Sequence, residues 1–342
     1  MSDYQLTLLL GAGFSKEIFP KFPTMQELTK SVLEDTEVKS LLRAIDIPLP
    51  LFGQKAKRDV NIEDWIQILE ESGVYFKNTL TYERRKLVVK VILDRISKII
   101  QSISSDLEFT PAQLDLFEEL IKSKVSILTT NYDLIFERAI YELMVRNRID
   151  LKTPYDLNVG RIELAYKRKR ETYLSAGYSD VSQFSRIYKL HGSCDWFSPG
   201  IDESEEVFVD ISLLRDYLGS DLQLLSREIC ESMTPLFAGP SSIKSQQINS
   251  KAIKPIWASA YSALRGTSKL FVYGSSLHKS DATLNSLVIE GLPTGVGSII
   301  FDPKAAEIRE RLDFLTTQEN NYAQPLEKVS FEDLVKSISI YS

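Results

Sequence analysis

Histidine and cysteine, which often do acid–base and metal chemistry, are rare in this chain of 342 residues. It contains two histidines, His191 and His278, and two cysteines, Cys194 and Cys230. The cysteines are too far apart for a CxxC pair, so a four-thiolate zinc site is excluded, a disulfide framework is not expected and no metal is predicted. If the chemistry needs an imidazole, His191 is the better candidate, because it follows a short apolar stretch and precedes Gly192, which permits close approach. A structural histidine is the alternative, and His278 is expected at the surface.

A second candidate is the turn Gly11-Ala12-Gly13-Phe14-Ser15, which follows the apolar run Leu8-Leu9-Leu10. Glycine lets the backbone pass close to a ligand, and free N–H groups at the start of a following helix bind phosphate. The turn is not the oxidoreductase fingerprint, because Lys16 stands where a third glycine is required. It is not a Walker loop either, because no Gly-Lys-Ser/Thr follows. A tight strand-to-helix turn without a ligand is the alternative.

Polar residues also follow other apolar stretches. The three sets are Thr129-Thr130-Asn131-Tyr132-Asp133, Gly274-Ser275-Ser276 and Asp302-Pro303. Polar groups at the carboxyl ends of parallel strands are where ligands bind in open α/β sheets, and an acidic side chain there can bond ribose hydroxyls. For Asp133 and Asp302, capping of the next helix is the alternative.

These candidates need a scaffold that brings strand ends together. Five apolar stretches predict strands, at residues 5–10, 124–128, 187–190, 270–273 and 298–301, with helices between them. This order predicts an α/β fold with a doubly wound parallel, Rossmann-like sheet. We expect one domain over 1–342 with a core of residues 1–35, 120–198 and 265–342. A helical insertion (36–119) and a variable insertion (199–264) complete it.

Local signals place several elements around this sheet. Helix-start signals occur at Thr24 with Glu27, at Thr110 with Gln113, and at Ser280. Further helices are expected over 134–145 and 330–340, and a strand near 207–210. Residues 15–23 are predicted to form a flexible cover over the ligand rather than a helix.

The composition excludes some functions. Hydrophobic residues make up 43% and charged residues 26% of the chain, an ordinary balance for a globular protein. The net charge of -6 argues against a general nucleic-acid coat, and the basic run Lys167 to Arg170 is read as solvated surface. Direct nucleic-acid binding is therefore not expected. No apolar run reaches the length of a membrane span and no signal peptide is evident, so a cytoplasmic protein is expected.

Four motifs in order resemble those of sirtuin-like domains. They are Gly11-Ala12-Gly13-Phe14-Ser15, Thr130-Asn131-Tyr132-Asp133, Lys189-Leu190-His191-Gly192-Ser193 and Tyr273-Gly274-Ser275-Ser276-Leu277. The closest likeness is to the divergent bacterial branch found in antiphage defence systems. It covers roughly residues 1–35, 120–198 and 265–342 and leaves both insertions out. It implies NAD as the substrate.

The resemblance also implies roles for individual residues. The phosphate contacts would come from Gly11, Ala12, Gly13 and Ser15, and Thr130 would belong to the same dinucleotide site. Near the nicotinamide ribose, Asn131 would orient water or the ribose, His191 would be the base, and Asp133 would support the local network. The adenosine half would lie along Gly274, Ser275 and Asp302.

The chain departs from the family in two ways. It lacks the four-cysteine zinc module that deacylating sirtuins usually carry, which favours plain NAD hydrolysis over protein deacylation. It has Gly274-Ser275-Ser276 where related motifs often have Gly-Tyr-Ser, a departure that falls on the residues expected to contact the adenosine half. The resemblance further implies a homo-oligomer and a partner protein such as a HerA-type ATPase or an Argonaute, with the helical insertion as the assembly surface.

Three other readings stay open at this point. The same pocket would serve a sensor that binds NAD or ADP-ribose without turnover. A protein deacylase would use the same substrate. A nucleic-acid-binding structural protein would rest on the basic run Lys167 to Arg170 and would show steep salt dependence.

Overall fold

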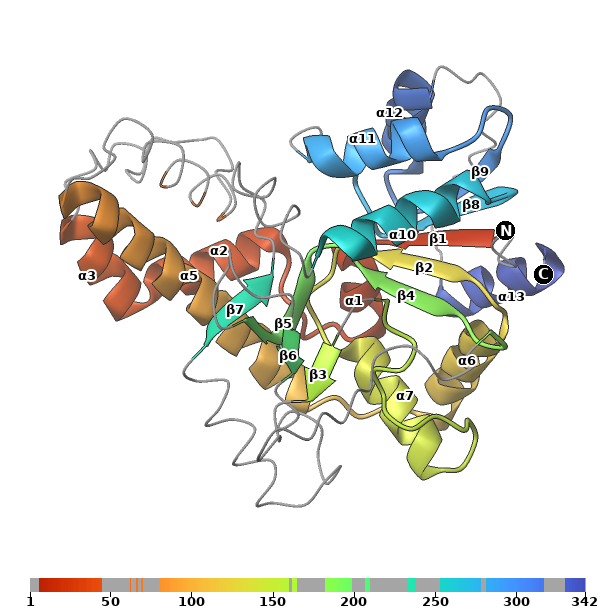
Figure 1. Ribbon diagram of the computed structural model, residues 1–342, viewed down its shortest axis with the longest axis horizontal. Helices are drawn as coiled ribbons and strands as arrows, with labels where there is room; N and C mark the ends of the chain where they lie inside the picture. The colour runs from red at the N-terminus through yellow and green to blue at the C-terminus, as the bar shows by residue number, and fades with distance from the viewer. Residues whose placement is uncertain are drawn as a thin grey trace.

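The computed structural model describes residues 6–44, 62, 66, 69, 80–159, 162–164, 182–198, 207–209, 233–237, 253–277, 281–316 and 330–341. Its centre is a five-stranded, fully parallel sheet in the order β4-β2-β1-β8-β9. The strands are β1 (Leu6–Leu10), β2 (Ser126–Thr129), β4 (Arg186–Lys189), β8 (Lys269–Tyr273) and β9 (Gly297–Phe301). The predicted Rossmann-like parallel sheet is therefore confirmed (Figure 1).

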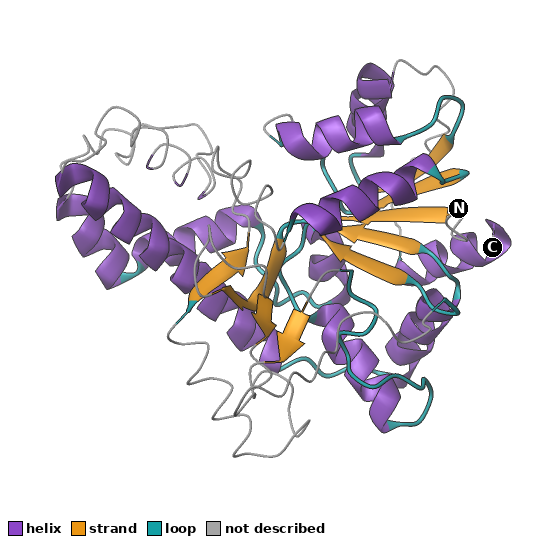
Figure 2. Cartoon of the chain, in the orientation of Figure 1, coloured by secondary structure: helices purple, strands orange, loops and turns teal. Residues whose placement is uncertain are grey.

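Helices cover both faces of this sheet, which explains why its strands are apolar runs rather than alternating patterns. Along β1, Leu8 and Leu10 belong to one buried cluster and Leu9 to the other, because successive side chains point to opposite faces. The first cluster includes α6 (Pro111–Lys122), α7 (Ile135–Val145) and α13 (Phe331–Tyr341). The second includes α10 (Lys254–Arg265), α11 (Ala282–Gly291) and α12 (Ala305–Thr316). Figure 2 shows these layers as purple helices on either side of the orange strands.

Two predicted helix starts are confirmed. The Thr24 and Glu27 pair forms a capping box at the start of α2 (Met25–Glu34), and Thr110 and Gln113 form another before α6. The prediction for residues 15–23 is wrong. A helix, α1 (Ala12–Ile18), begins immediately after Gly11. It is held because Phe14 and Ile18 are buried, and Phe14 packs against four other aromatic rings.

A second sheet beside the first was not predicted, apart from its strand near 207–210. It has the order β3-β6-β5-β7, from β3 (Ile162–Leu164), β5 (Gly192–Ser198), β6 (Val207–Val209) and β7 (Thr234–Phe237). Only two residues, Leu190 and His191, separate β5 from β4. The chain therefore passes from one sheet to the other at the candidate histidine (Figure 1).

The predicted helical texture of 36–119 appears as α3 (Thr36–Ala44), α5 (Leu80–Ser105) and most of α6. Helical Ile62 and Ile66 are also buried in the first cluster. However, α6 and α10, which lie largely in the predicted insertions, pack against elements of the parallel-sheet core. None of the helices in the described ranges is long and apolar enough to cross a membrane.

Candidate functional site

A cavity of about 430 Å³ lies at the carboxyl ends of the parallel strands. All but one of the site residues predicted from the sequence line it: Asn131, Asp133, His191, Gly11, Ala12, Ser15, Thr130, Gly274, Ser275 and Asp302. The strand order places β2 and β4 on one side of β1, and β8 and β9 on the other. The cavity thus occupies the topological switch point of a doubly wound sheet, where ligands bind in this class of fold. Its size falls within the range of small-molecule and cofactor sites.

The exception is Gly13, which does not line the cavity. Its N–H donates to the Gly274 carbonyl at 2.9 Å, so this amide is committed to the protein rather than offered to a phosphate. A Cβ at Gly13 would lie 2.7 Å from Gly274 Cα, and one at Gly11 would lie 2.5 Å from the Gly274 carbonyl oxygen. The second glycine of the turn is therefore explained by backbone packing between β1–α1 and the end of β8. Its predicted phosphate contact is not supported.

Gly274 completes this contact from the other side. Its φ is +59°, in the left-handed region, and a Cβ there would lie 2.3 Å from Phe14 N. Its own N–H donates to the Phe301 carbonyl at 3.1 Å, so the ends of β8 and β9 are also tied together. The floor of the cavity is thus a rigid junction of backbone segments.

Asn131 is held by its amide nitrogen. Nδ2 donates to the Gly11 carbonyl at 2.9 Å and to Ser15 Oγ at 2.8 Å. Because the Gly11 carbonyl can only accept, this contact fixes which end of the amide is nitrogen. Both N–H donors are used, so Asn131 can offer a ligand only its carbonyl oxygen, a hydrogen-bond acceptor. That suits a water proton or a ribose hydroxyl.

Asp133 supports Asn131 indirectly, through Ser15. Its Oδ2 accepts from Ser15 Oγ at 2.5 Å and its Oδ1 accepts from Ile135 N at 3.1 Å. Burial raises the pKa of Asp133, and the charge of Lys189 opposes that shift. Both carboxyl oxygens therefore already hold α1 and the start of α7. The N-cap position of α7 is Leu134, so Asp133 holds the start of this helix from the preceding residue rather than capping it directly.

His191 is 4% exposed and sits at the turn between the two sheets. Its ring centroid is 6.1 Å from that of Tyr132 and 6.3 Å from that of Trp257. Its Nε2 lies 3.5 Å from Asp281 Oδ2, and Asp281 also lines the cavity. The imidazole is therefore fixed between aromatic rings and faces a carboxylate.

Sequence reasoning missed Asp281. The cap of α11 was predicted at Ser280, but Asp281 fills that position, with its Oδ1 accepting from Leu284 N at 3.1 Å. One carboxylate thus caps a helix and faces His191. Asp281 could have been found from the sequence as a helix-capping residue that directly follows the loop after β8. His278, Cys230 and the run 167–170 lie outside the described residues.

The far end of the cavity is formed by the residues after β9. Asp302 Oδ1 accepts from Lys304 N at 2.8 Å, and burial raises the pKa of the Asp302 carboxyl. Helix α12 begins at Ala305, so Pro303 is not its first residue, and Asp302 makes a turn before the helix rather than capping it directly. Lys304, also missed from the sequence, places an exposed cation beside the cavity, suited to an anionic group.

Apolar side chains line another part of the wall. They come from α2, the segment before it and α5: Phe22, Met25, Leu28 and Ile100. Helices outside the parallel sheet therefore help to enclose the site, which sequence reasoning did not foresee. A cavity with a mainly apolar wall and a few fixed polar groups is typical of sites for cofactor-sized ligands.

No protein-family model matches this chain, and comparison with curated proteins gives no match. Within the described residues, no group of three or more His, Cys, Asp and Glu side chains could hold a metal ion. The assignment of function consequently depends on the geometry of the cavity and on the motifs that line it.

Proposed function

We propose that this chain is an NAD⁺ hydrolase that cleaves the bond between nicotinamide and ribose. The observation that carries the proposal is the convergence of Asn131, His191 and the Gly11 turn on one cavity at the switch point of the sheet. The four motifs that resemble sirtuin-like domains all contribute residues to this cavity.

The reaction converts NAD⁺ and water into nicotinamide, ADP-ribose and a proton. The glycosidic bond breaks with an oxocarbenium-like sugar, as in other glycoside hydrolyses. Nicotinamide leaves as a neutral molecule, since the bonding electrons neutralise its pyridinium nitrogen, so the leaving group needs no acid. The site must then place a water molecule and take one proton from it.

The residues of the cavity divide these tasks. The Asn131 carbonyl oxygen accepts a hydrogen bond from the water or from a ribose hydroxyl, and His191 takes the proton. Ser15 and Asp133 hold Asn131 in place. The start of α1 faces the phosphates through Ala12, because the Gly11 N–H already donates to the Tyr273 carbonyl at 3.1 Å. The remaining predicted contacts, from Thr130, Gly274, Ser275 and Asp302, hold the rest of the dinucleotide.

The wider setting follows from the same resemblance. The proposal is that hydrolysis depletes NAD as part of antiphage defence, within a homo-oligomer and with a partner such as a HerA-type ATPase or an Argonaute. The region 36–119 is the proposed assembly surface. This part of the proposal rests on the family resemblance alone. An isolated protein that is monomeric and fully active would contradict it.

The decisive experiment incubates the purified chain with NAD⁺ and follows nicotinamide and ADP-ribose by chromatography, with and without the product of the neighbouring gene. We expect both products in equal amounts. Binding of NAD⁺, measured by calorimetry in parallel, distinguishes two failures: binding without turnover supports the sensor, and neither binding nor turnover rejects the proposal. An acyl-lysine peptide added to the assay tests the deacylase alternative.

Asn131→Ala sharpens the test. It should lower kcat by about 10²-fold with little change in NAD⁺ affinity, because the lost acceptor acts on the reacting groups. Lys98→Ala, a change of an exposed lysine on α5 paired with Asp94, is the control. A variant that binds NAD⁺ weakly but turns it over at the normal rate would make Asn131 a binding residue only.

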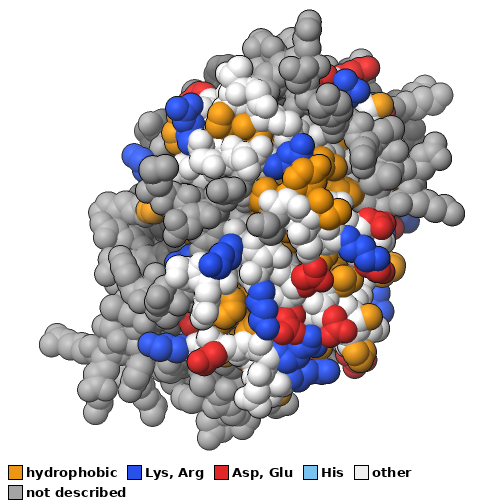
Figure 3. Space-filling view, turned by 90° about the vertical axis from the view of Figure 1, so that its right-hand side faces the viewer, with side chains coloured by type: hydrophobic (Ala, Val, Ile, Leu, Met, Phe, Trp, Pro, Cys, Tyr) orange, Lys and Arg blue, Asp and Glu red, His pale blue; other side chains and the backbone are white. Residues whose placement is uncertain are grey.

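The charge distribution does not favour the nucleic-acid alternative on the face shown in Figure 3. There, Lys and Arg side chains alternate with Asp and Glu side chains. The ion pair Lys122–Glu118 lies within α6, and Lys336–Glu332 lies within α13. The pair Arg148–Asp115 joins the segment after α7 to α6. Such pairing leaves no extended basic surface among the described residues of that face.

A further inference from the structure

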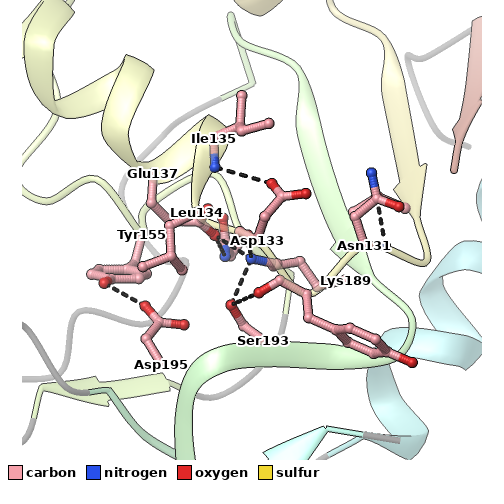
Figure 4. Close-up of polar contacts among 12 residues, drawn as sticks. Asn131, Asp133, Leu134, Ile135, Glu137, Tyr155, Lys189, Ser193 and Asp195 are labelled. Carbon is pink, nitrogen blue, oxygen red and sulfur yellow. Dashed lines mark hydrogen bonds and ion pairs between the residues drawn. The ribbon is translucent and has the colours of Figure 1, made fainter. Parts of the chain in front are cut away.

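Lys189, the last residue of β4, is buried directly behind the candidate site (Figure 4). Its Nζ donates to three acceptors: the Asp133 carbonyl at 2.7 Å, Glu137 Oε1 at 3.0 Å and Ser193 Oγ at 2.6 Å. An ammonium group has three donors, so all of them are used within the protein. Lys189 is thus not available to a ligand, and its effect on the site must act through its partners.

The three acceptors come from different segments. The Asp133 carbonyl ends the loop that carries Asn131, Ser193 stands two residues after His191 on β5, and Glu137 is in the first turn of α7. Ser193 Oγ is also 3.4 Å from the Tyr132 carbonyl, in the same loop. One ammonium group therefore joins the loop of Asn131 to the turn of His191.

Lys189 and Asn131 also meet at a second place. Asn131, Asp133, Glu137 and Lys189 line one small interior cavity of about 10 Å³. This is close to the space that one water molecule needs. Little free space separates Lys189 from Asn131, so we expect a shift of the Lys189 side chain to disturb Asn131 rather than to be absorbed.

The surroundings keep Lys189 charged. Burial alone would lower the pKa of its ammonium group, but the carboxyl groups of Glu137, Asp195 and Asp133 hold the pKa above its ordinary value. Hydrogen bonds from a charged donor are shorter and stronger than neutral ones. A buried ion pair is nevertheless weak evidence for added stability, because desolvation offsets the attraction. The cluster is better explained by what it positions.

We propose that Lys189 is a positioning residue, which fixes the separation between the Asn131 loop and the His191 turn and thereby aligns water and sugar in the hydrolysis proposed above. The inference rests on that proposed function. It assigns Lys189 no contact with the substrate, so its loss should reduce the rate of the chemical step rather than the binding of NAD⁺.

The test uses the double variant Lys189→Met/Glu137→Gln, which removes the ammonium group together with the negative charge of Glu137, the carboxylate that it bonds. We expect kcat to fall about 100-fold, the loss typical of a small misplacement of reacting groups, with KM within about threefold of the wild-type value. Arg138→Met is the matched control. It removes a different buried cation, on α7, which donates to the Leu107 carbonyl and lines neither cavity.

The control separates positioning from general destabilisation. Arg138→Met should lower the melting temperature and leave kcat within about twofold of wild type. An equal loss of kcat in the control, or a double variant that is folded and fully active, would overturn the proposal. So would a loss confined to KM.

Ser193→Ala keeps the proposal testable if the double variant does not fold. It removes one acceptor of Lys189 on the β5 side and should lower kcat about tenfold. A change below about twofold would contradict the proposal. If wild-type protein shows no NAD⁺ turnover, the proposed function fails on its own. Hydrogen exchange at residues 129–135 and 190–194 then still reports whether Ser193→Ala loosens both segments together, and unchanged protection would reject the positioning role.

Discussion

The two sides of the cavity are built differently. On the side of β2 and β4, Asn131, Asp133 and His191 are fixed by side-chain contacts and rest on the buried charges around Lys189. On the side of β8 and β9, backbone packing around Gly274 forms the wall, and Asp302 and Lys304 are partly or largely exposed. The fixed side chains of the first side suit catalytic groups, which must be held in one orientation toward the reacting atoms. The second suits groups that hold a substrate without changing it.

The largest expected effect is on the first side. His191→Ala should lower the rate of nicotinamide release by about 10²–10⁴-fold, the usual contribution of a positioned base, while far-UV circular dichroism stays unchanged. His191→Gln is the sharper companion, since it keeps a polar side chain of similar length that cannot take a proton at neutral pH. If either variant turns over NAD⁺ at the wild-type rate, the side of β2 and β4 is not the chemical side.

The buried charges of that side predict a pH effect on stability. Burial raises the pKa of Asp195 to about 6 against the opposing charge of Lys189, and Asp195 Oδ2 accepts from Tyr155 OH at 2.7 Å. In the unfolded chain the carboxyl group loses its proton near pH 4, so between about pH 4 and 6 the folded state binds more protons. Stability from this group therefore falls as the pH rises through that window, by about 2–3 kcal/mol in total.

Asp195→Asn removes this titration and retains an acceptor for Tyr155. The variant should gain stability relative to wild type between about pH 4 and 6, and the difference should then level off. Urea unfolding at a series of pH values measures it. If the difference in unfolding free energy between variant and wild type does not vary with pH, Asp195 does not titrate in this window. The prediction of a pH-sensitive buried charge on the side of β2 and β4 would then be wrong.

The sequence predicted the parallel sheet and most of the cavity because the signals were local. Runs such as Leu8-Leu9-Leu10 are long enough to form buried strands, and topology then brings their carboxyl ends to one edge. Since each strand end carried its own polar set, Asn131, His191 and Asp302 could be assigned to one site without knowledge of any contact between them.

The remaining features depended on contacts between distant segments. Asp281 is close to His191 only because α11 starts beside β4 in space, and ninety residues separate the two in the chain. The Gly-Ala-Gly motif would look the same in the sequence whether the Gly13 amide bound a phosphate or the Gly274 carbonyl. The strand β5 was missed because Gly192, Ser193 and Asp195 are weak strand formers, and its burial comes from tertiary packing.

The glycine wall of the second side gives the next prediction. Gly274→Ala places a Cβ 2.3 Å from Phe14 N at a φ of +59°, so the junction of α1 with β8 must shift. Gly295→Ala is the matched control, because its φ is +87° but a Cβ there meets nothing within 4 Å. The control should cost about 1 kcal/mol for backbone conformation alone, and Gly274→Ala about 2 kcal/mol more. Equal losses in thermal unfolding would show that the glycine contact is not tight.

The smallest expected effect tests the holding role of the second side. Asp302→Asn should raise KM for NAD⁺ about tenfold and leave kcat nearly unchanged, because a ribose contact contributes equally to the ground state and the transition state. It should also narrow the preference for NAD⁺ over NADP⁺, since a carboxylate repels a 2′-phosphate. Asp313→Asn, on α12 and paired with Arg309, is the control and should change neither value. If Asp302→Asn instead lowered kcat by about as large a factor as it raised KM, catalysis would depend on both sides of the cavity. The proposed separation between a chemical side and a binding side would then be wrong.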